Sequence, residues 1–376
     1  MNCKRAIEIC KQKLEVTMKS IPRNMPEYCA CSNGRYFELT SPLDFNNIET
    51  WMPSFFTGQA LLAYEESKDT KYLEWLERFS KVYEDKVFRY PENTMHDLGF
   101  LYTPYAVGLY RLTGKHTYRR MALKAADELS KRYQIKGEFI RAWGRVDELE
   151  GPRASEAIID CMMNLPLLFW AEKETGNPFY GEVAKHHADT TMANFIRADG
   201  SVYHAFHFDR ETGEPLWGCN YCGYADESFW ARGCTWAIYG FMVAYTHTGI
   251  YKYLELSERL SKRFMDEIAM GGGVDGYIPY WDFRLASTVE KKRDSSAAAI
   301  AASAFYSLAS ITKESMYKHW ADGILKELIT PEYLDSDISI PGILKHSNGL
   351  DHYTLFGDYF FMEALMKCQY DWQMYW

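Results

Sequence analysis

Asp160 is the first residue whose surroundings suggest chemistry, because it lies inside the apolar run IIDCMM at residues 158–163. Ionising a carboxyl group in apolar surroundings is costly unless the group is paired, so the acid either finds a partner or keeps its proton at a raised pKa. Both outcomes suit general acid/base catalysis. The alternative is a buried aspartate that ties down a neighbouring helix, and this segment alone favours neither.

A second carboxylate, Asp97, follows His96 and precedes the apolar run LGFLYTPY at residues 98–105. This run has the pattern of a helix start, and aspartate is a common residue at a helix N-cap. Asp97 is therefore predicted either to cap that helix or to serve as a second acid beside Asp160.

Other residue patterns that could carry chemistry are weak. His204 and His207 lie three residues apart in HAFHFD, but this segment offers no convincing third ligand and no H-E-x-x-H pattern, so we expect neither a metal nor a cofactor. The pair His186–His187 is expected on the surface of an outer helix. The sequence contains no G-x-S-x-G, P-loop or Rossmann fingerprint, which argues against triad hydrolysis and nucleotide chemistry.

Composition narrows the possible partners. Aromatic residues make up 16% of the 376 residues, with 28 Tyr and 11 Trp, which suits stacking on sugar rings, although large helical cores also use aromatics. The net charge of -9 argues against a nucleic-acid or anionic-membrane partner, since either favours a basic surface. A small anionic ligand would need only one or two well-placed Arg or His residues.

The cysteines and the N-terminus predict a cytoplasmic protein. The nine Cys residues are scattered without a C-x-x-C pair, as is typical of reduced thiols. The first 20 residues have charged residues at amphipathic helical spacing and no apolar core of a signal peptide. No run reaches the ~18 to 20 apolar residues of a membrane span.

The elements that must position the candidate residues form a repeat. Five times, a helix of small and apolar residues reaches a break, and a tyrosine then opens a second helix that carries Lys and Glu. A Gly after the first helix is the expected C-cap, from which the chain can reverse into an antiparallel partner. An N-terminal helix over 4–21 and a C-terminal helix over 357–367 could pair as a sixth hairpin. The five hairpins cover 55–86, 97–133, a segment from Asp160 through Tyr180, 227–268 and 294–330.

Six hairpins closed in a ring form an (α/α)6 barrel. The predicted fold class is therefore all-α, with one catalytic domain over residues 1–376. The terminal helices complement each other, which favours closure over an open solenoid of hairpins. Pro104 and Pro166 fall inside two expected inner helices, where each predicts a kink.

The loops that enter the inner helices of such a ring line one mouth, and the candidate residues lie there. His96 and Asp97 open the second hairpin, Asp160 lies one turn into the third, and Arg232 and Trp236 fall in the fourth. Long aromatic connections join the hairpins, and connections of that length in a compact domain are usually functional. They cover residues 141–145, 199–209 and 271–283.

Seven segments along nearly the whole chain carry a family resemblance. They are HDLGFL (96–101), IIDCMMNLPLLFWA (158–171), DGSVYH (199–204), GYADESFWARGCTWAIYGFMVAY (223–245), YWDF (280–283), DSSAAAIAAS (294–303) and GDYFFMEAL (357–365). In this order they resemble the unsaturated glucuronyl hydrolases, glycoside hydrolase family 88. The resemblance implies an (α/α)6 barrel, in agreement with the hairpin count.

The resemblance also implies an activity. The family acts on glycosaminoglycan-type oligosaccharides left by polysaccharide lyases, whose non-reducing end is a uronic acid with a C4=C5 double bond. It hydrates that bond, and the C5 hemiketal then opens and releases the rest of the sugar. An acid must protonate C4 and a base must take a proton from water at C5, which one carboxyl group can do in turn. We expect an apolar setting with a second carboxylate nearby to keep that group protonated at the start.

Residue roles follow from the same resemblance. Asp160 matches the general acid/base and Asp97 its partner carboxylate, while His204, Arg232 and Trp236 match residues that hold the unsaturated uronate. An Arg suits this task because its guanidinium can bind a carboxylate through two hydrogen bonds. The aromatic walls of the site are matched by Trp51, Trp143 and Trp230.

Two cysteines depart from the family pattern. Cys222 and Cys234 stand where Gln is expected, and the first of these Gln residues is expected to bind the substrate through a hydrogen bond. A thiol is a poor replacement for an amide. This departure bears on the preferred substrate and on efficiency more than on the reaction. The alternative is that Cys222 fills space while another group supplies the bond.

Three other functions are weighed against this activity. An unsaturated rhamnogalacturonyl hydrolase shares the barrel and the chemistry but differs in the sugar beyond the bond. A sugar epimerase or isomerase on the same barrel is expected to use paired His residues, whereas Asp leads here. A glycan-binding barrel without turnover is the alternative outside enzymology. The sequence predicts no oligomeric state.

Overall fold

The computed structural model describes residues 2–20, 29–30, 33–36, 51–148, 150–151, 153–271, 276–370 and 372–376. They fall into two compact units. The first unit comprises Met1–Val82 and Phe264–Met374, and the second comprises Tyr83–Arg263 and Tyr375–Trp376. The single catalytic domain proposed for residues 1–376 stays a prediction.

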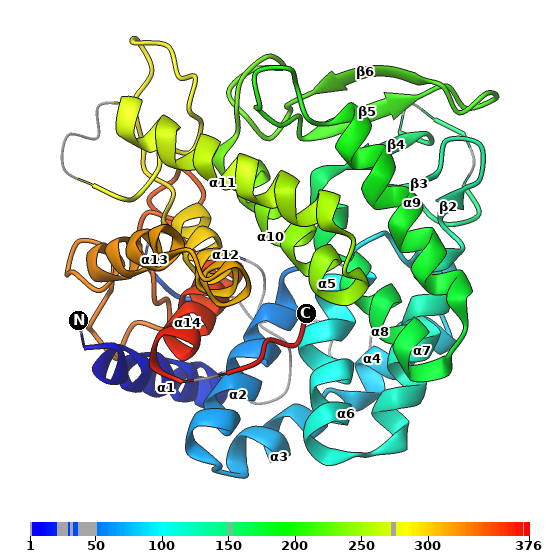
Figure 1. Cartoon of the computed structure of the whole chain (residues 1–376). Coiled ribbons are helices and arrows are strands. Elements are labelled where there is room, and N and C mark those ends of the chain that lie inside the picture. Colours follow the sequence, from blue (N-terminus) through cyan, green and yellow to red (C-terminus); the bar gives the residue numbers. More distant parts are fainter. Residues whose placement is uncertain are drawn as a thin grey trace. The chain divides into compact units, whose positions relative to one another are not determined.

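The second unit contains hairpins at the predicted places (Figure 1). Helix α7 packs against α5 and α8, and α8 packs against α9 and α10. The helices are α5 (Leu98–Tyr102), a π-helical turn (Thr103–Val107), α6 (Gly108–Thr113), α7 (His116–Ser130), α8 (Leu165–Thr175), α9 (Pro178–Asn194), α10 (Ala231–Thr248) and α11 (Tyr251–Met270), whose last turns belong to the first unit.

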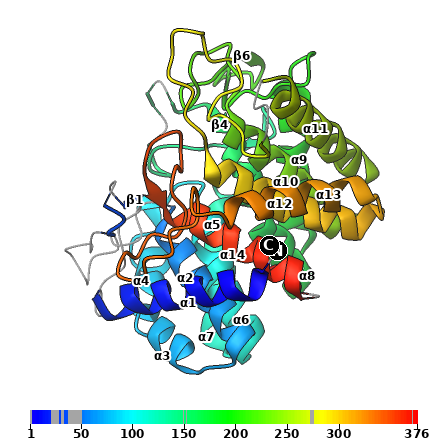
Figure 2. The same ribbon diagram turned by 90° about the vertical axis from the view of Figure 1, so that its left-hand side faces the viewer.

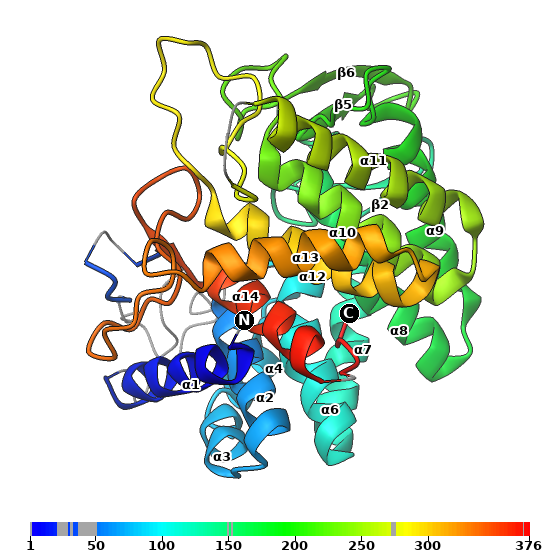
Figure 3. The same cartoon turned by 60° about the vertical axis from the view of Figure 1, so that its left-hand side comes forward.

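In the first unit the C-terminal helix α14 packs against α1, α2 and α12, and α12 packs against α13 (Figures 2 and 3). The predicted pairing of the N- and C-terminal helices is thereby confirmed. The N-terminal helix ends at Ser20, and Ile21, its predicted last residue, lies outside the described residues. The helices are α1 (Cys3–Ser20), α2 (Pro53–Ser67), α3 (Lys71–Glu77), α12 (Ser295–Thr312), α13 (Ser315–Leu328) and α14 (Leu355–Gln369), while α4 (Ser80–Phe88) crosses the boundary between the units.

Left-handed residues end the first helix of each predicted hairpin. Gly114, Gly176 and Gly249 have φ values of 67°, 72° and 69°, which glycine adopts without a steric cost. Lys68 and Lys313 take the same conformation, with φ of 59° and 62°. In each case the cap N–H donates to a carbonyl four residues earlier, so the chain can reverse at once.

Small residues allow α12 to lie deep in the first unit. Its sequence SSAAAIAASAFYSLASIT is buried along most of its length, and the Asp294 side chain caps it by accepting from the N–H groups of Ser296 and Ala297 at 3.0 and 3.2 Å. Among the described helices, α12 alone is long and apolar enough to cross a membrane. Because 72% of it is buried, α12 is better explained as a core helix.

The two predicted proline kinks have different outcomes. Pro104 has non-helical angles, and the chain passes through a π-helical turn there, so that kink is confirmed. The kink at Pro166 is wrong, because Pro166 is in the first turn of α8, where a missing N–H breaks no helical hydrogen bond.

Short strands interrupt the predicted all-α architecture. Strands β4 (Glu156–Ile158), β5 (Ala205–Phe208) and β6 (Pro215–Cys219) form an antiparallel sheet in that order. The aromatic connection predicted at 199–209 therefore contains a strand. Two smaller pairs are β2 (Tyr133–Gln134) with β3 (Phe139–Ile140), and β1 (Cys29–Ala30) with β7 (Tyr353–Thr354).

Candidate active site

Asp160 lies just before a helix, and a sheet sets its position. It belongs to a short 3-10 helix (Ile159–Met163) that directly follows β4, so its predicted place one turn inside an inner helix is wrong. Ile158 is paired with Ala205, and the N–H of Ile159 donates to the carbonyl of His204 at 2.8 Å. The β4–β5 register thus brings His204 beside Asp160.

Close backbone contacts bring the Asp97 segment to the Asp160 segment. A Cβ atom on Gly99 would lie 2.3 Å from the Cα of Asn164, so only glycine allows this approach. The Asn164 side chain accepts from the N–H of Phe100 at 2.7 Å and donates to the carbonyl of Asp160 at 3.3 Å. One buried amide therefore bridges the two segments that carry the candidate carboxylates.

Asp97 does not act as a helix cap. It precedes α5, but its side chain makes no capping hydrogen bond, and only 5% of the residue is exposed. Burial and the charge of Asp160 raise the pKa of Asp97 to about 7, against the opposing charges of Arg132 and Lys86. Asp97 is thus suited to hold or release a proton near neutral pH.

His96 is the nearest basic neighbour of Asp97. Its Nε2 atom lies 3.2 Å from Oδ1 of Asp97. Complete burial lowers the pKa of His96 to about 3, so its ring is neutral at pH 7 and the contact is not an ion pair. The cations that favour the ionised form of Asp97 are therefore Arg132 and Lys86.

Asp160 differs from Asp97 in its charge environment. Its Oδ2 atom lies 3.5 Å from Nε2 of His204. Burial raises the pKa of Asp160, but His204 and Arg232 outweigh it and hold that pKa below its usual range. Burial opposes the charge of His204, yet Asp160 and Cys222 raise its pKa to about 9. The expectation that the apolar setting keeps Asp160 protonated is wrong for this structure, in which the net pKa shift is downward for Asp160 and upward for Asp97.

The first turns of α10 supply a cation and an aromatic face. The guanidinium of Arg232 lies 4.5 Å from the ring centroid of Trp230, whose ring meets that of His204 edge to face at 4.9 Å. A Cβ on Gly233 would lie 2.5 Å from the Trp230 ring, so glycine makes room for it. Arg232 is mostly buried, with 7% exposed, and is close enough to Asp160 to lower its pKa.

Trp236 lies one turn deeper in the same helix. Its side chain is completely buried and packs against Phe100, with ring centroids 5.3 Å apart. In this conformation it has no surface for a ligand. The placement favours support of the α5–α10 contact over direct binding of the uronate.

A hydrogen-bonded cluster that the sequence did not reveal fixes the Trp143 wall. The buried carboxylate of Glu156 accepts from Nε1 of Trp143 at 2.9 Å and from the Tyr221 hydroxyl at 2.7 Å. The ring centroids of Tyr221 and His204 are 4.3 Å apart, and those of Trp143 and His96 are 5.7 Å apart. Trp143 and Tyr221 therefore lie next to the residues that surround the two carboxylates. An acid in the apolar strand EAI was the available sequence signal for Glu156.

Cys222 is exposed, and its electrostatic contact is with His204. His207 does not join this contact. Its Nε2 lies 3.7 Å from both Oε2 of Glu156 and Sγ of Cys219. Within the described part of the chain, no group of three or more His, Cys, Asp or Glu could hold a metal ion.

Three other sequence interpretations fall outside this site. Trp51 belongs to the first unit, where it stacks on Phe356 at 4.9 Å, and its part in the site stays a prediction. His187 is completely buried and accepts from the N–H of Ile140 at 2.9 Å, so its predicted surface position is wrong. Within the connection 271–283, residues 272–275 lie outside the described residues.

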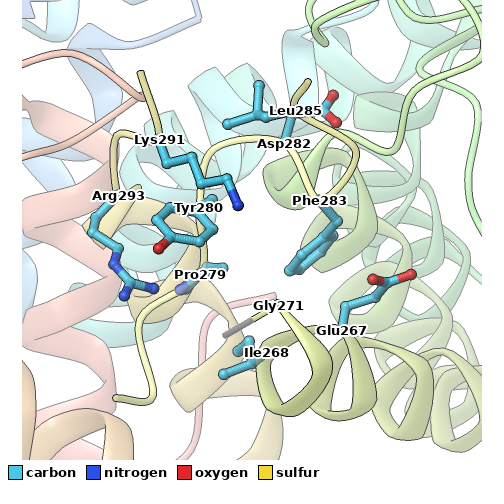
Figure 4. Close-up of a pocket in the computed structure, with 10 residues that line it drawn as sticks. All are labelled: Glu267, Ile268, Gly271, Pro279, Tyr280, Asp282, Phe283, Leu285, Lys291 and Arg293. Atoms are coloured by element: carbon cyan, nitrogen blue, oxygen red, sulfur yellow. The ribbon is translucent and has the colours of Figure 1, made fainter. Parts of the chain in front are cut away.

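A pocket of the first unit contains none of the predicted site residues (Figure 4). Its wall includes Tyr280, over whose ring lie Arg293 at 4.1 Å and Lys291 at 5.6 Å. Phe283 lies across the pocket from them, whereas the Glu267 carboxylate points away from them in the close-up. Neither Asp97 nor Asp160 lines this pocket, so it is not the candidate active site.

The second unit thus brings together Asp97, Asp160, His204, Arg232, Trp230, Trp143 and Cys222. Two carboxyl groups whose environments push their pKa values apart are the usual sign of an acid and a base with separate tasks. Two cations beside one of them suit an anionic substrate, and the aromatic faces suit a sugar ring.

Comparisons with known proteins agree with this site. The sequence profile of Glycosyl Hydrolase Family 88 matches residues 32–269. The unsaturated chondroitin disaccharide hydrolase of Streptococcus pneumoniae (strain ATCC BAA-255 / R6) is 35% identical over 359 residues, which cover 90% of this chain and 88% of that protein.

Solved structures extend the similarity over the whole chain. The unsaturated glucuronyl hydrolase of Streptococcus agalactiae has a TM-score of 0.89 and 31% identity, covering 100% of this chain and 94% of that one. A mutant of the enzyme complexed with dGlcA-GalNAc6S has a TM-score of 0.82 and 28% identity, covering 100% and 93%. The predicted all-α barrel class is confirmed by these neighbours.

Proposed function

The chain belongs to Glycosyl Hydrolase Family 88, and from this premise we propose that Asp160 and Asp97 carry its reaction. The protein is a glycoside hydrolase that acts on unsaturated uronyl oligosaccharides of the glycosaminoglycan type. It removes the 4,5-unsaturated uronic acid from their non-reducing end. The observation that carries the assignment of the site is the pair of buried carboxylates with opposite pKa shifts, next to His204 and Arg232.

In the proposed reaction, Asp160 donates a proton to C4 and the C4=C5 electron pair forms the new C4–H bond. The positive charge that develops at C5 is shared with the ring oxygen. Water then adds to C5 while the same carboxylate takes its proton, so Asp160 ends as it began. The C5 hemiketal opens, its ring C–O bond breaks, and the hemiacetal at C1 that results releases the rest of the sugar.

The substrate itself is proposed to supply the protonated state of Asp160. The uronate carboxylate is expected to bind Arg232 and His204, because a guanidinium and an imidazolium beside an aromatic wall match an anionic sugar. Its negative charge opposes the two cations that lower the pKa of Asp160. The burial of Asp160 then dominates, its pKa rises, and it takes up a proton when the uronate binds.

The walls of the proposed site are Trp143 and Trp230, with Tyr221 added by the structure. Trp236 is proposed to act as a support for α10, and the part of Trp51 in an aromatic wall rests on the family resemblance alone. The partner is the unsaturated oligosaccharide. We expect no nucleic acid and no membrane as partners, and the proposed location is the cytoplasm.

A substrate panel tests this function. The protein is incubated with unsaturated disaccharides from chondroitin, hyaluronan, heparin and pectin, and loss of the ultraviolet absorbance of the conjugated double bond is followed. We expect loss on at least one glycosaminoglycan disaccharide. The same sugar after reduction of the double bond should release no free monosaccharide, which is followed by chromatography because the reduced sugar has no such absorbance. Cleavage of the pectin product alone would favour the rhamnogalacturonyl hydrolase, and no loss on any sugar would refute the hydrolase.

Isotopes test the proposed chemistry on the substrate that is cleaved. In D2O one deuterium should appear at C4 of the released uronic acid, and in H2(18)O the label should enter at C5. Label found only at C1 would mean direct attack on the anomeric carbon, and hydration of the double bond would then be wrong.

Cys222 provides a prediction about substrate preference. We expect Cys222→Gln to change KM or the order of preference across the panel, because an amide both donates and accepts hydrogen bonds where the thiol does so weakly. Cys219→Ser, three residues away in β6, is the matched control and should leave that order unchanged. Identical kinetics of wild type and Cys222→Gln on every sugar would show that this position does not select the substrate.

A further inference from the structure

Arg132 is a buried cation that binds only main-chain oxygens. It follows α7, only 1% of it is exposed, and its guanidinium donates five hydrogen bonds. Within the described residues, no carboxylate forms an ion pair with Arg132. The acceptors are the carbonyls of Arg141 at 2.8 Å, Thr94 at 2.7 Å, Ala142 at 3.2 Å, Trp143 at 2.7 Å and Gly144 at 3.0 Å.

Such an arrangement is costly for stability alone. Burying a guanidinium removes its hydration, and an apolar side chain of similar volume often serves the fold as well or better. The five carbonyls accept from Nε, Nη1 and Nη2 of Arg132, but their dipoles do not cancel its charge. Its pKa falls to about 9, with burial the main cause, and the negative charge of Asp97 opposes that fall.

The five carbonyls come from two segments that carry candidate site residues. Thr94 is three residues before Asp97, and residues 141–144 include the wall residue Trp143. A backbone bond from the N–H of His96 to the carbonyl of Ala142, 3.2 Å long, joins the same two segments. Arg132 thus holds both segments from one point.

We propose that Arg132 is a positioning residue of the active site, whose guanidinium fixes the segments that carry Asp97 and Trp143 and places a positive charge near Asp97. This inference rests on the proposed function of Asp97. Arg132 acts through other residues, so it has a geometric task and an electrostatic task. The two tasks can be separated by substitution.

The charge near Asp97 comes from several groups. Asp160 opposes its ionisation, Arg132 and Lys86 favour it, and the neutral His96 adds no charge at pH 7. Removing the cation at 132 leaves Lys86 as the remaining cation of this set. The proton of Asp97 should then be released at a higher pH.

The experiment compares two variants. Arg132→Met loses both the guanidinium donors and the positive charge, whereas Arg132→Lys keeps the charge but not the several N–H donors of the planar guanidinium. We expect both to lose at least about tenfold in kcat on the disaccharide that the wild type cleaves. The transition of kcat/KM near pH 7 should move up by about one pH unit in Arg132→Met and stay in place in Arg132→Lys. If Arg132→Met fails to fold, Arg132→Gln replaces it as the uncharged variant.

Arg141→Met is the matched control. Arg141 is another buried arginine of the same segment and donates to the carbonyls of Arg145 and Glu148. Its charge lowers the pKa of Arg132, but it is not among the charges that act on Asp97. It should lower the melting temperature without moving the transition. Equal pH profiles in the Lys and Met variants, or a shift of the same size in Arg141→Met, would overturn the proposal.

Titration of carbon-13-labelled Asp97 followed by NMR separates this inference from the proposed function. The same upward shift in Arg132→Met is expected whether or not any sugar is cleaved. If the protein is inactive on the whole panel but Arg132→Met still shows this shift, the proposed function is refuted, and the electrostatic effect of Arg132 on Asp97 is retained. An active protein without the shift would refute the inference alone.

Discussion

Replacing Asp160 with asparagine lowers turnover by at least ~100-fold and leaves the protein folded, because the amide can neither donate a proton to C4 nor take one from water. The fold should survive, since asparagine has nearly the same shape and Asp160 is held through its backbone by Asn164 and β4. Turnover is measured on the best sugar of the panel, and folding by circular dichroism and melting temperature.

Two measurements separate this effect from general damage. Asp127→Asn is the matched control, because Asp127 accepts a hydrogen bond from Tyr180 between α7 and α9 and has no place in the proposed site. It should cost some stability and keep kcat. In Asp160→Asn the pKa of His204, about 9 in the wild type, should fall, because its charged partner is gone. Near-normal turnover in Asp160→Asn would remove Asp160 from its role.

Replacing Asp97 with asparagine should lower activity ~10- to 100-fold and, at the same time, make the protein more stable above neutral pH. The pKa of Asp97 is about 7 in the folded chain and ~3.9 in an unfolded chain. A raised pKa favours the folded state at low pH, and that advantage is lost as pH rises from ~4 through ~7. The ionised wild-type residue therefore costs a few kcal/mol that neutral asparagine avoids.

Melting temperatures at two pH values test this prediction. Wild type and Asp97→Asn should melt at similar temperatures near pH 4.5, and the variant should melt several degrees higher at pH 8. The transition of kcat/KM near pH 7 should also disappear. A variant that is less stable than the wild type at pH 8 would show that Asp97 is ionised in a favourable setting, against its raised pKa.

The helical hairpins were predictable because their signals are local. A glycine at 114, 176 or 249 ends one helix, and the next helix begins at His116, Pro178 or Tyr251, slightly before the tyrosine predicted to start it, so each turn is readable from a short window. The hairpin breaks at Lys68 and Lys313 were found through the same spacing. The short strands were missed, since two to five residues carry too little periodicity to separate them from a loop.

The electrostatics of the site could not be predicted from local sequence. The run IIDCMM correctly predicts that Asp160 is buried, but its charge state depends on His204, which comes from a distant segment through the β4–β5 register. Glu156 and Tyr221 meet across 65 residues of sequence. Trp236 matches a family position, yet only the packing of α10 against Phe100 shows that it is completely buried.

Two glycines near Asp160 allow close backbone packing, and this packing limits which substitutions the protein can accept during evolution. Gly99 brings its segment onto the backbone of Asn164, and Gly240 brings α10 onto Met162, where a Cβ would lie 2.4 Å from the Met162 Cβ. Even one methyl group at either place would push the acid away from its neighbours. New substrate preferences are therefore expected to arise in strands and loops such as 141–148 and 215–222, while the helices around the acid stay as they are.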